Sequence, residues 1–71
     1  MTADRLKRVM WLLRELYPNQ DIFTLAAVRR AIMQEIGTDY RTIKRNIKAI
    51  IEIGYLKRLN MHQFRDEGTQ Y

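Results

Sequence analysis

Four turn-favouring residues divide this chain: its one proline, Pro18, and its three glycines, Gly37, Gly54 and Gly68. Proline fixes φ and glycine tolerates positive φ, so both are strong signals of turns. Each stretch between them has room for one helix or one hairpin. The whole chain has 71 residues, which allows a single domain over 1–71.

The first stretch predicts an amphipathic helix over residues 3–17. Its apolar side chains recur at helical spacing and form one stripe. Pro18 ends the helix, because the residue before a proline is pushed out of the helical region. Trp11 points almost opposite the stripe, with Leu12 on the flank. Two interpretations stay open: Trp11 lies flat on its own helix, or Trp11 and Leu12 are buried in a partner interface.

The second stretch predicts a short strand and a helix. Ile22 and Phe23 form an apolar pair that is long enough for one β-bridge. Thr24 is a good N-cap, so we expect the second helix over residues 24–36. Gly37 follows this helix, where a left-handed conformation costs glycine little.

The third stretch predicts a helix over residues 39–53, with Asp39 as its N-cap and Gly54 at its end. Its isoleucines form an apolar stripe that must pack against the rest of the protein, because β-branched residues are mediocre helix formers alone. The opposite face and its flanks are polar and carry Arg41, Thr42, Lys44, Arg45, Lys48 and Glu52.

Residues 55–71 predict a hairpin, or wing. Residues 55–64 mix apolar and polar side chains without a helical period, which favours an irregular strand. We expect the turn over residues 65–69, with Gly68 available for positive φ. Residues 69–71 would then begin the returning strand.

The excess positive charge is concentrated in one part of the chain. The net charge is +5, and residues 38–65, with seven basic and two acidic side chains, have a net charge of +5 by themselves. A localised basic surface raises the local concentration of polyanions, which indicates a nucleic-acid partner. A basic surface without any partner is the alternative interpretation.

Several classes of function are not expected. There is no cysteine and His62 is the only histidine, so neither a thiolate site nor a metal site is predicted. No Gly-rich phosphate loop or carboxylate pair is present, so we expect no enzyme activity, no cofactor and no small-molecule substrate. No long apolar run or signal peptide occurs, which favours a cytoplasmic, DNA-associated protein without membrane contact.

One segment resembles the second turn and recognition helix of winged helix-turn-helix regulators. That family has a hydrophobic-Gly turn, a small capping residue and then Arg-Thr-hydrophobic-x-Arg-x-hydrophobic. The matching segment is Ile36-Gly37-Thr38-Asp39-Tyr40-Arg41-Thr42-Ile43-Lys44-Arg45-Asn46-Ile47. Asp39 stands where Ser is commoner, which preserves the cap, and Thr38 stands where an aliphatic residue is commoner.

The resemblance extends over residues 20–71, because residues 56–71 also look like the long wing of some plasmid and phage replication or regulatory proteins. It implies a mainly α fold with a small β-hairpin (α+β), in the order helix, strand, helix, helix, strand, wing, strand. It also implies a sequence-specific double-stranded DNA-binding protein, of the transcriptional-regulator type. The helix 39–53 would enter the major groove, and the wing would contact the backbone or the minor groove.

Side-chain chemistry suggests a role for each candidate. Arg41 and Arg45 suit base edges, because arginine can bind guanine through two hydrogen bonds. Thr42 could touch a thymine methyl or a phosphate, while Lys44 and Lys48 suit phosphates. The remaining candidates are Thr24 at a helix start, Asp39 at the cap, and Arg58 and Arg65 in the wing.

Two other functions stay open. A winged-helix fold can serve as a protein-interaction module in a replication or transcription assembly, and Trp11 and Leu12 favour that function. RNA binding is a third possibility, with few aromatic groups to stack on bases. The oligomeric state stays open, and a homodimer through the first helix is one candidate assembly, because many small groove-binding proteins occupy two half-sites.

Overall fold

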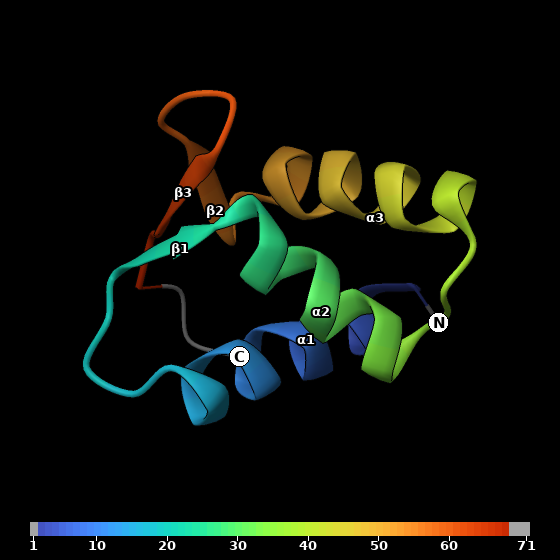
Figure 1. The fold of residues 1–71 in the computed structure, drawn as a ribbon, viewed down its shortest axis with the longest axis horizontal. Coiled ribbons are helices and arrows are strands. Elements are labelled where there is room, and N and C mark those ends of the chain that lie inside the picture. Colours follow the sequence, from blue (N-terminus) through green and yellow to red (C-terminus); the bar gives the residue numbers. More distant parts are fainter. Residues whose placement is uncertain (1, 69–71) are drawn as a thin grey trace.

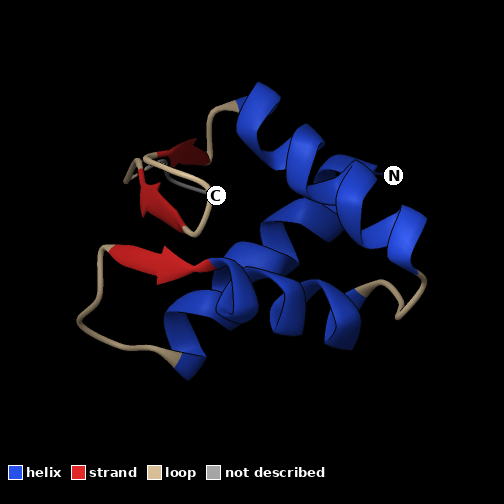
Figure 2. Cartoon of the chain, turned by 45° about the horizontal axis from the view of Figure 1, so that its top comes forward, coloured by secondary structure: helices blue, strands red, loops and turns tan. Residues whose placement is uncertain are grey.

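The computed structural model describes the backbone of residues 2–68 and the side chains of residues 5–68. Three helices form one body, and three short strands lie together at one end of it (Figures 1 and 2). This is the predicted α+β, winged-helix-like layout, and each helix lies within one residue of its predicted bounds. The elements are α1 (Thr2–Leu16), β1 (Ile22–Thr24), α2 (Leu25–Glu35), α3 (Tyr40–Ile53), β2 (Leu56–Arg58) and β3 (Gln63–Asp66).

The core lies between the three helices and the inner face of the sheet. Four side chains of the predicted stripe of α1 are fully buried where α1 packs under α2 (Figure 1), namely Leu6, Val9, Met10 and Leu13, whereas Leu16 is exposed. From the sheet, Phe23 and Phe64 close the core at one end. The largest fully buried side chains are Phe23, Phe64, Leu6, Met10, Leu13, Ile32, Ile50 and Leu56.

Both predicted N-caps are present. The Thr24 hydroxyl accepts a hydrogen bond from the Ala27 N–H at 3.1 Å. Asp39 Oδ2 accepts from the N–H groups of Arg41 and Thr42, at 3.1 and 3.3 Å. These bonds satisfy N–H groups that have no partner inside a helix, and so they fix where α2 and α3 begin.

The C-terminal ends of α2 and α3 differ in backbone conformation. Gly54 ends α3 with φ of +97°, in the left-handed region. The prediction of a left-handed Gly37 is wrong, because its φ is not positive. Instead, the N–H groups of Ile36 and Gly37 both donate to the Ile32 carbonyl, at 2.8 and 3.2 Å. With this carbonyl satisfied twice, the chain continues to Asp39 without a left-handed residue.

The sheet is antiparallel, and its strand order is β1-β3-β2. Phe64, in the central strand, is directly opposite Phe23 on one side and Arg58 on the other. Opposed residues of an antiparallel pair share a face of the sheet. Phe64 is buried, so this row marks the inner face.

The wing differs from its prediction in the position of its turn. The turn expected over residues 65–69 is wrong: β3 runs through Asp66, and the chain reverses between Leu59 and His62. Asn60 closes this turn, since its Oδ1 accepts from the His62 N–H at 2.8 Å and its amide donates to Gln63 at 2.9 Å. Gly68 does have positive φ, at +71°. The strand expected over residues 69–71 lies outside the described residues.

Within the described part of the chain, no helix is long and apolar enough to cross a membrane.

Candidate nucleic-acid interface

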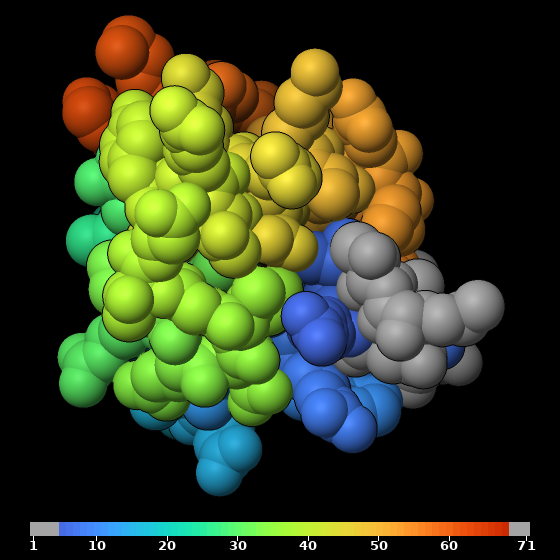
Figure 3. Space-filling model, turned by 90° about the vertical axis from the view of Figure 1, so that its right-hand side faces the viewer, coloured from blue at the N-terminus to red at the C-terminus, as the bar shows by residue number. Residues whose placement is uncertain are grey.

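The basic side of α3 faces away from the protein body. Ile43, Asn46 and Ile50 are buried against the core. The side chains on the opposite side of α3 are exposed (Figure 3, where α3 is seen from its N-terminal end in the upper part of the molecule, in yellow to orange). The exposed cations are Arg41, Lys44, Arg45 and Lys48. The C-terminal hairpin lies beside this surface and leaves it accessible (Figure 1).

Asp39 has a structural task at the start of α3. Its carboxylate accepts from two N–H groups of the first turn, which places Arg41 and Thr42 in regular helix geometry. The negative charge also lies at the positive end of the helix dipole, where it stabilises the helix. Asp39 therefore orients the basic face and is itself committed to the backbone.

An apolar groove of about 970 Å³, open to solvent, lies where α2, α3 and β2 meet. It brings together five of the sequence-predicted DNA contacts: Arg41, Lys44, Arg45, Lys48 and Arg58. The groove also reaches Leu25 and Arg29 on α2, which the sequence interpretation missed. A signal for Arg29 was present, because it follows Leu25 by four residues and so shares its side of the helix.

Thr42 lies on the other flank of α3. It lines a smaller hollow of about 220 Å³ together with Arg5 of α1 and Asn46. The Asn46 amide donates to the Thr42 carbonyl at 2.7 Å. Of the residues predicted to contact DNA on α3, Thr42 is the one farthest from the groove side, whereas Arg45 lines both hollows.

The two wing arginines lie on opposite faces of the sheet. Arg58 is opposite Phe64 on the inner face, with its guanidinium 5.5 Å from the centre of the Phe64 ring. Arg65, the next residue after Phe64, points to the outer face, where it is opposite Lys57. Arg65 also forms an ion pair with Glu67 at 3.4 Å. The structure therefore places Arg58 beside α3 and separates Arg65 from it.

Thr24 lies at the junction of β1 and α2, where its hydroxyl is engaged as the cap. The next backbone N–H, that of Leu25, donates to the His62 carbonyl in the wing turn at 2.8 Å. Two N–H groups of the first turn of α2, those of Leu25 and Ala27, are therefore already bonded within the protein. The bond to His62 also ties the wing to the start of α2.

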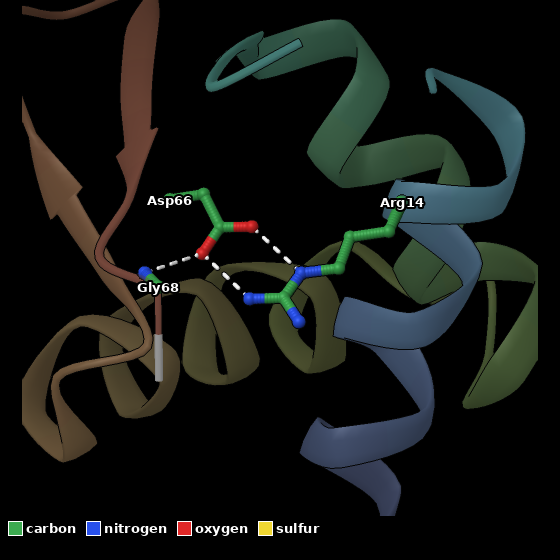
Figure 4. A network of polar contacts seen from close by, with 3 residues as sticks. All are labelled: Arg14, Asp66 and Gly68. Atoms are coloured by element: carbon green, nitrogen blue, oxygen red, sulfur yellow. Dashed lines mark hydrogen bonds and ion pairs between the residues drawn. The ribbon is translucent and has the colours of Figure 1, made fainter. Parts of the chain in front are cut away.

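An ion pair that the sequence interpretation missed joins the last turn of α1 to the end of β3. Arg14 on α1 donates to both carboxylate oxygens of Asp66, at 2.8 and 2.9 Å, and the Gly68 N–H donates to one of them (Figure 4). Burial acts to raise the pKa of Asp66, but the bonds from Arg14 and Gly68, with the Arg14 charge, hold this pKa below its usual value. No local pattern could predict the pair, since its members are 52 residues apart.

Trp11 and Leu12 are neighbours on α1 but differ in exposure to solvent. Trp11 is 51% exposed, whereas Leu12 is half-buried and packs against the core. Leu16, one turn further along, is also exposed. The outward direction predicted for Trp11 is confirmed, and its partner stays a prediction.

Among residues 5–68, no three His, Asp or Glu side chains are grouped so that they could hold a metal ion. No protein-family model matches the chain, and comparison with curated proteins and with solved structures finds no significant similarity. The function must therefore be inferred from the surface itself.

Proposed function

We propose that the protein binds double-stranded DNA through the exposed basic face of α3 and acts as a sequence-specific regulator. The observation that carries this proposal is the arrangement of four exposed cations along one helix whose opposite side is in the core. An α-helix fits the major groove when its outer face is polar. Like charges at this spacing repel one another in the free protein, and the phosphates of a duplex relieve that repulsion.

The proposal gives the residues different tasks. Arg41 and Arg45 would contact base edges, since arginine can bind guanine through two hydrogen bonds. Lys44 and Lys48 would contact phosphates and so fix the position of the helix without reading sequence. Arg58 would contact the backbone beside α3, held in place by the Phe64 ring.

The separation of the wing arginines changes one expectation. Arg65 lies on the outer face of the sheet and is paired with Glu67, so the proposal does not depend on it. Thr24 would act mainly by starting α2, because its hydroxyl already accepts from Ala27.

Selection from a pool of random duplexes tests the proposal. The parent protein should enrich a short consensus, and the double variant Arg41→Ala/Arg45→Ala should enrich none. Arg8→Ala/Arg30→Ala is the charge-matched control, because both residues are exposed and neither lines the groove, and it should enrich the same consensus as the parent. No enrichment by the parent, or an unchanged consensus with the α3 variant, would contradict the proposal. The symmetry of the consensus would also report the number of half-sites.

A second candidate function is protein assembly through α1. The observation that favours it is the half-exposed Trp11 on the outer side of α1, because aromatic residues are enriched in interfaces. A second copy of this chain is the partner that we would test first.

A further inference from the structure

The groove between α2, α3 and β2 has an apolar floor that DNA binding does not use. Leu25, Ile43, Ile47 and Ile51 line it, and Ile47 and Ile51 remain partly exposed although they pack against the core. Removing such apolar surface from water is favourable. Phosphates and sugar edges would cover this floor poorly, because they offer few apolar groups to it.

The rim of the same groove is strongly basic. Arg29 lies on the α2 side, Lys44 and Lys48 on the α3 side, and Arg58 on the sheet side, whereas Glu52 is the one acid that lines it. All of these side chains are exposed. A partner that fits must therefore be apolar on the side that enters the groove and negatively charged on both flanks.

We propose that this groove binds an acidic amphipathic helix of a partner protein. Tyr40, Lys44, Ile47 and Ile51 line one wall at spacings of four, three and four residues. This wall is roughly 16 Å long, which matches about three turns of a second helix. The opposite wall is α2, so the groove lies between two helices, as in other sites that bind an amphipathic helix by its apolar stripe.

The charge pattern also gives the partner its specificity. Basic residues on opposite sides of an apolar groove attract acidic flanks and reject basic ones. The proposal is independent of DNA binding, because binding of the peptide to the protein is measured in the absence of DNA. If DNA binding also holds, the two ligands would compete, since they share Lys44, Lys48 and Arg58.

The test uses a labelled peptide of about 14 residues, enough for three to four turns, with leucines on one face and glutamates on the flanks. Fluorescence anisotropy with the parent protein should show saturable binding of this peptide. A scrambled peptide of the same composition should not bind, and neither should a version with lysine in place of glutamate. Binding of all three peptides, or of none, would overturn the proposal.

Two variants locate the site. Arg29→Glu reverses one rim charge on an exposed position of α2 and should weaken binding at least about fivefold. Arg30→Glu is its matched control, because Arg30 is the neighbouring exposed residue and does not line the groove. An equal effect of both substitutions would mean general charge attraction and would overturn the proposal.

Ile51→Ser removes apolar floor without changing charge, and its fold is checked by thermal melting. It should also weaken peptide binding at least about fivefold, and it should leave the affinity for the selected duplex unchanged. Unchanged peptide binding would overturn the proposal. Loss of duplex binding would assign this floor to the DNA interface, which would overturn it too. If Ile51→Ser does not fold, Arg29→Glu and its control decide alone.

Discussion

Asp66 is a largely buried side chain that carries a charge within the fold. Its side chain is only 9% exposed, and it is held by the guanidinium of Arg14, whose side chain is 38% exposed. Arginine in this arrangement forms two parallel charge-assisted hydrogen bonds with a carboxylate. Taking away one partner leaves the other poorly satisfied, so the pair is sensitive to substitution.

The first prediction concerns the charge of Asp66. Asp66→Asn keeps the shape but removes the charge, and it should lower the free energy of unfolding by about 1–2 kcal/mol at neutral pH, after allowance for solvent screening of the exposed Arg14. Urea unfolding of both proteins measures the difference. Glu67→Gln is the control and should have a smaller effect, because its partner Arg65 is exposed.

The pH dependence of that difference follows from the lowered pKa of Asp66. The pKa of Asp66 in the folded state lies below 3.8, its usual value, which applies in the unfolded state. The folded state therefore binds the proton more weakly than the unfolded state does. The stabilisation is complete above that usual value and is lost as the pH falls through the lowered pKa. The parent and Asp66→Asn should converge in stability in strong acid. A constant difference between them from neutral pH to strong acid would contradict the assignment.

The second prediction concerns base reading by Arg45. Arg45→Ala should weaken binding to the selected duplex by about 1–3 kcal/mol and relax the preference at one base position. Lys48→Ala should weaken binding to all duplexes by a similar factor, because a phosphate contact carries no sequence information. An unchanged dissociation constant for Arg45→Ala would remove this residue from the interface.

At the scale of helices and strands, the two glycines on either side of α3, Gly37 and Gly54, are a matched pair. Neither would bring an added Cβ within 4 Å of another atom, but only Gly54 has a positive φ. The third prediction is that Gly54→Ala lowers the free energy of unfolding by about 1 kcal/mol. Gly37→Ala should be neutral or slightly stabilising, because alanine reduces the freedom of the unfolded chain. Thermal unfolding measures both, and equal losses would contradict this explanation.

Helices could be predicted from this sequence because their signals are local. The caps Thr24 and Asp39 and the left-handed Gly54 are each recognised within a few residues of the helix that they delimit. The turn of the wing is predicted in the wrong place because two segments carry turn-favouring residues. Gly68 in the later segment is a stronger turn signal than Asn60 in the earlier one. The structure uses Asn60 for the turn, since pairing of β3 with both β1 and β2 requires Gln63–Asp66 to be extended.

The basic face of the site could be predicted, but the groove could not. Spacing alone puts Arg41 and Arg45 on one side of a helix. The position of Arg29 opposite Lys44 depends on how α2 packs against α3, which no local pattern contains. The separation of Arg58 from Arg65 depends likewise on the sheet register, and a shift of one residue would reverse their faces.

At the scale of the whole molecule, charge should dominate affinity for DNA. The proposal assigns three cations to phosphates, Lys44, Lys48 and Arg58, and three phosphate contacts predict a slope of about −3 for log affinity against log salt concentration. This fourth prediction is measured by titrating the selected duplex at several salt concentrations. Lys48→Ala should bring the slope about one unit closer to zero. A slope near zero would contradict a phosphate interface.

The fifth prediction concerns assembly through α1. If a second copy covers Trp11, the parent should sediment as a dimer and Trp11→Ala as a monomer. Lys7→Ala is a control on the same helix and should leave the dimer intact. Identical monomeric profiles for the parent and Trp11→Ala would end the homodimer proposal and leave Trp11 on the free surface of its own helix.

The hydrogen bond from the Leu25 N–H to the His62 carbonyl, 2.8 Å long, has a consequence for the thermodynamics of binding. It ties the turn of the wing to the start of α2, so the interface that we propose for DNA is already arranged in the free protein. Binding then orders few residues. The change in heat capacity on association should therefore match the surface that becomes covered, without the larger change that accompanies coupled folding.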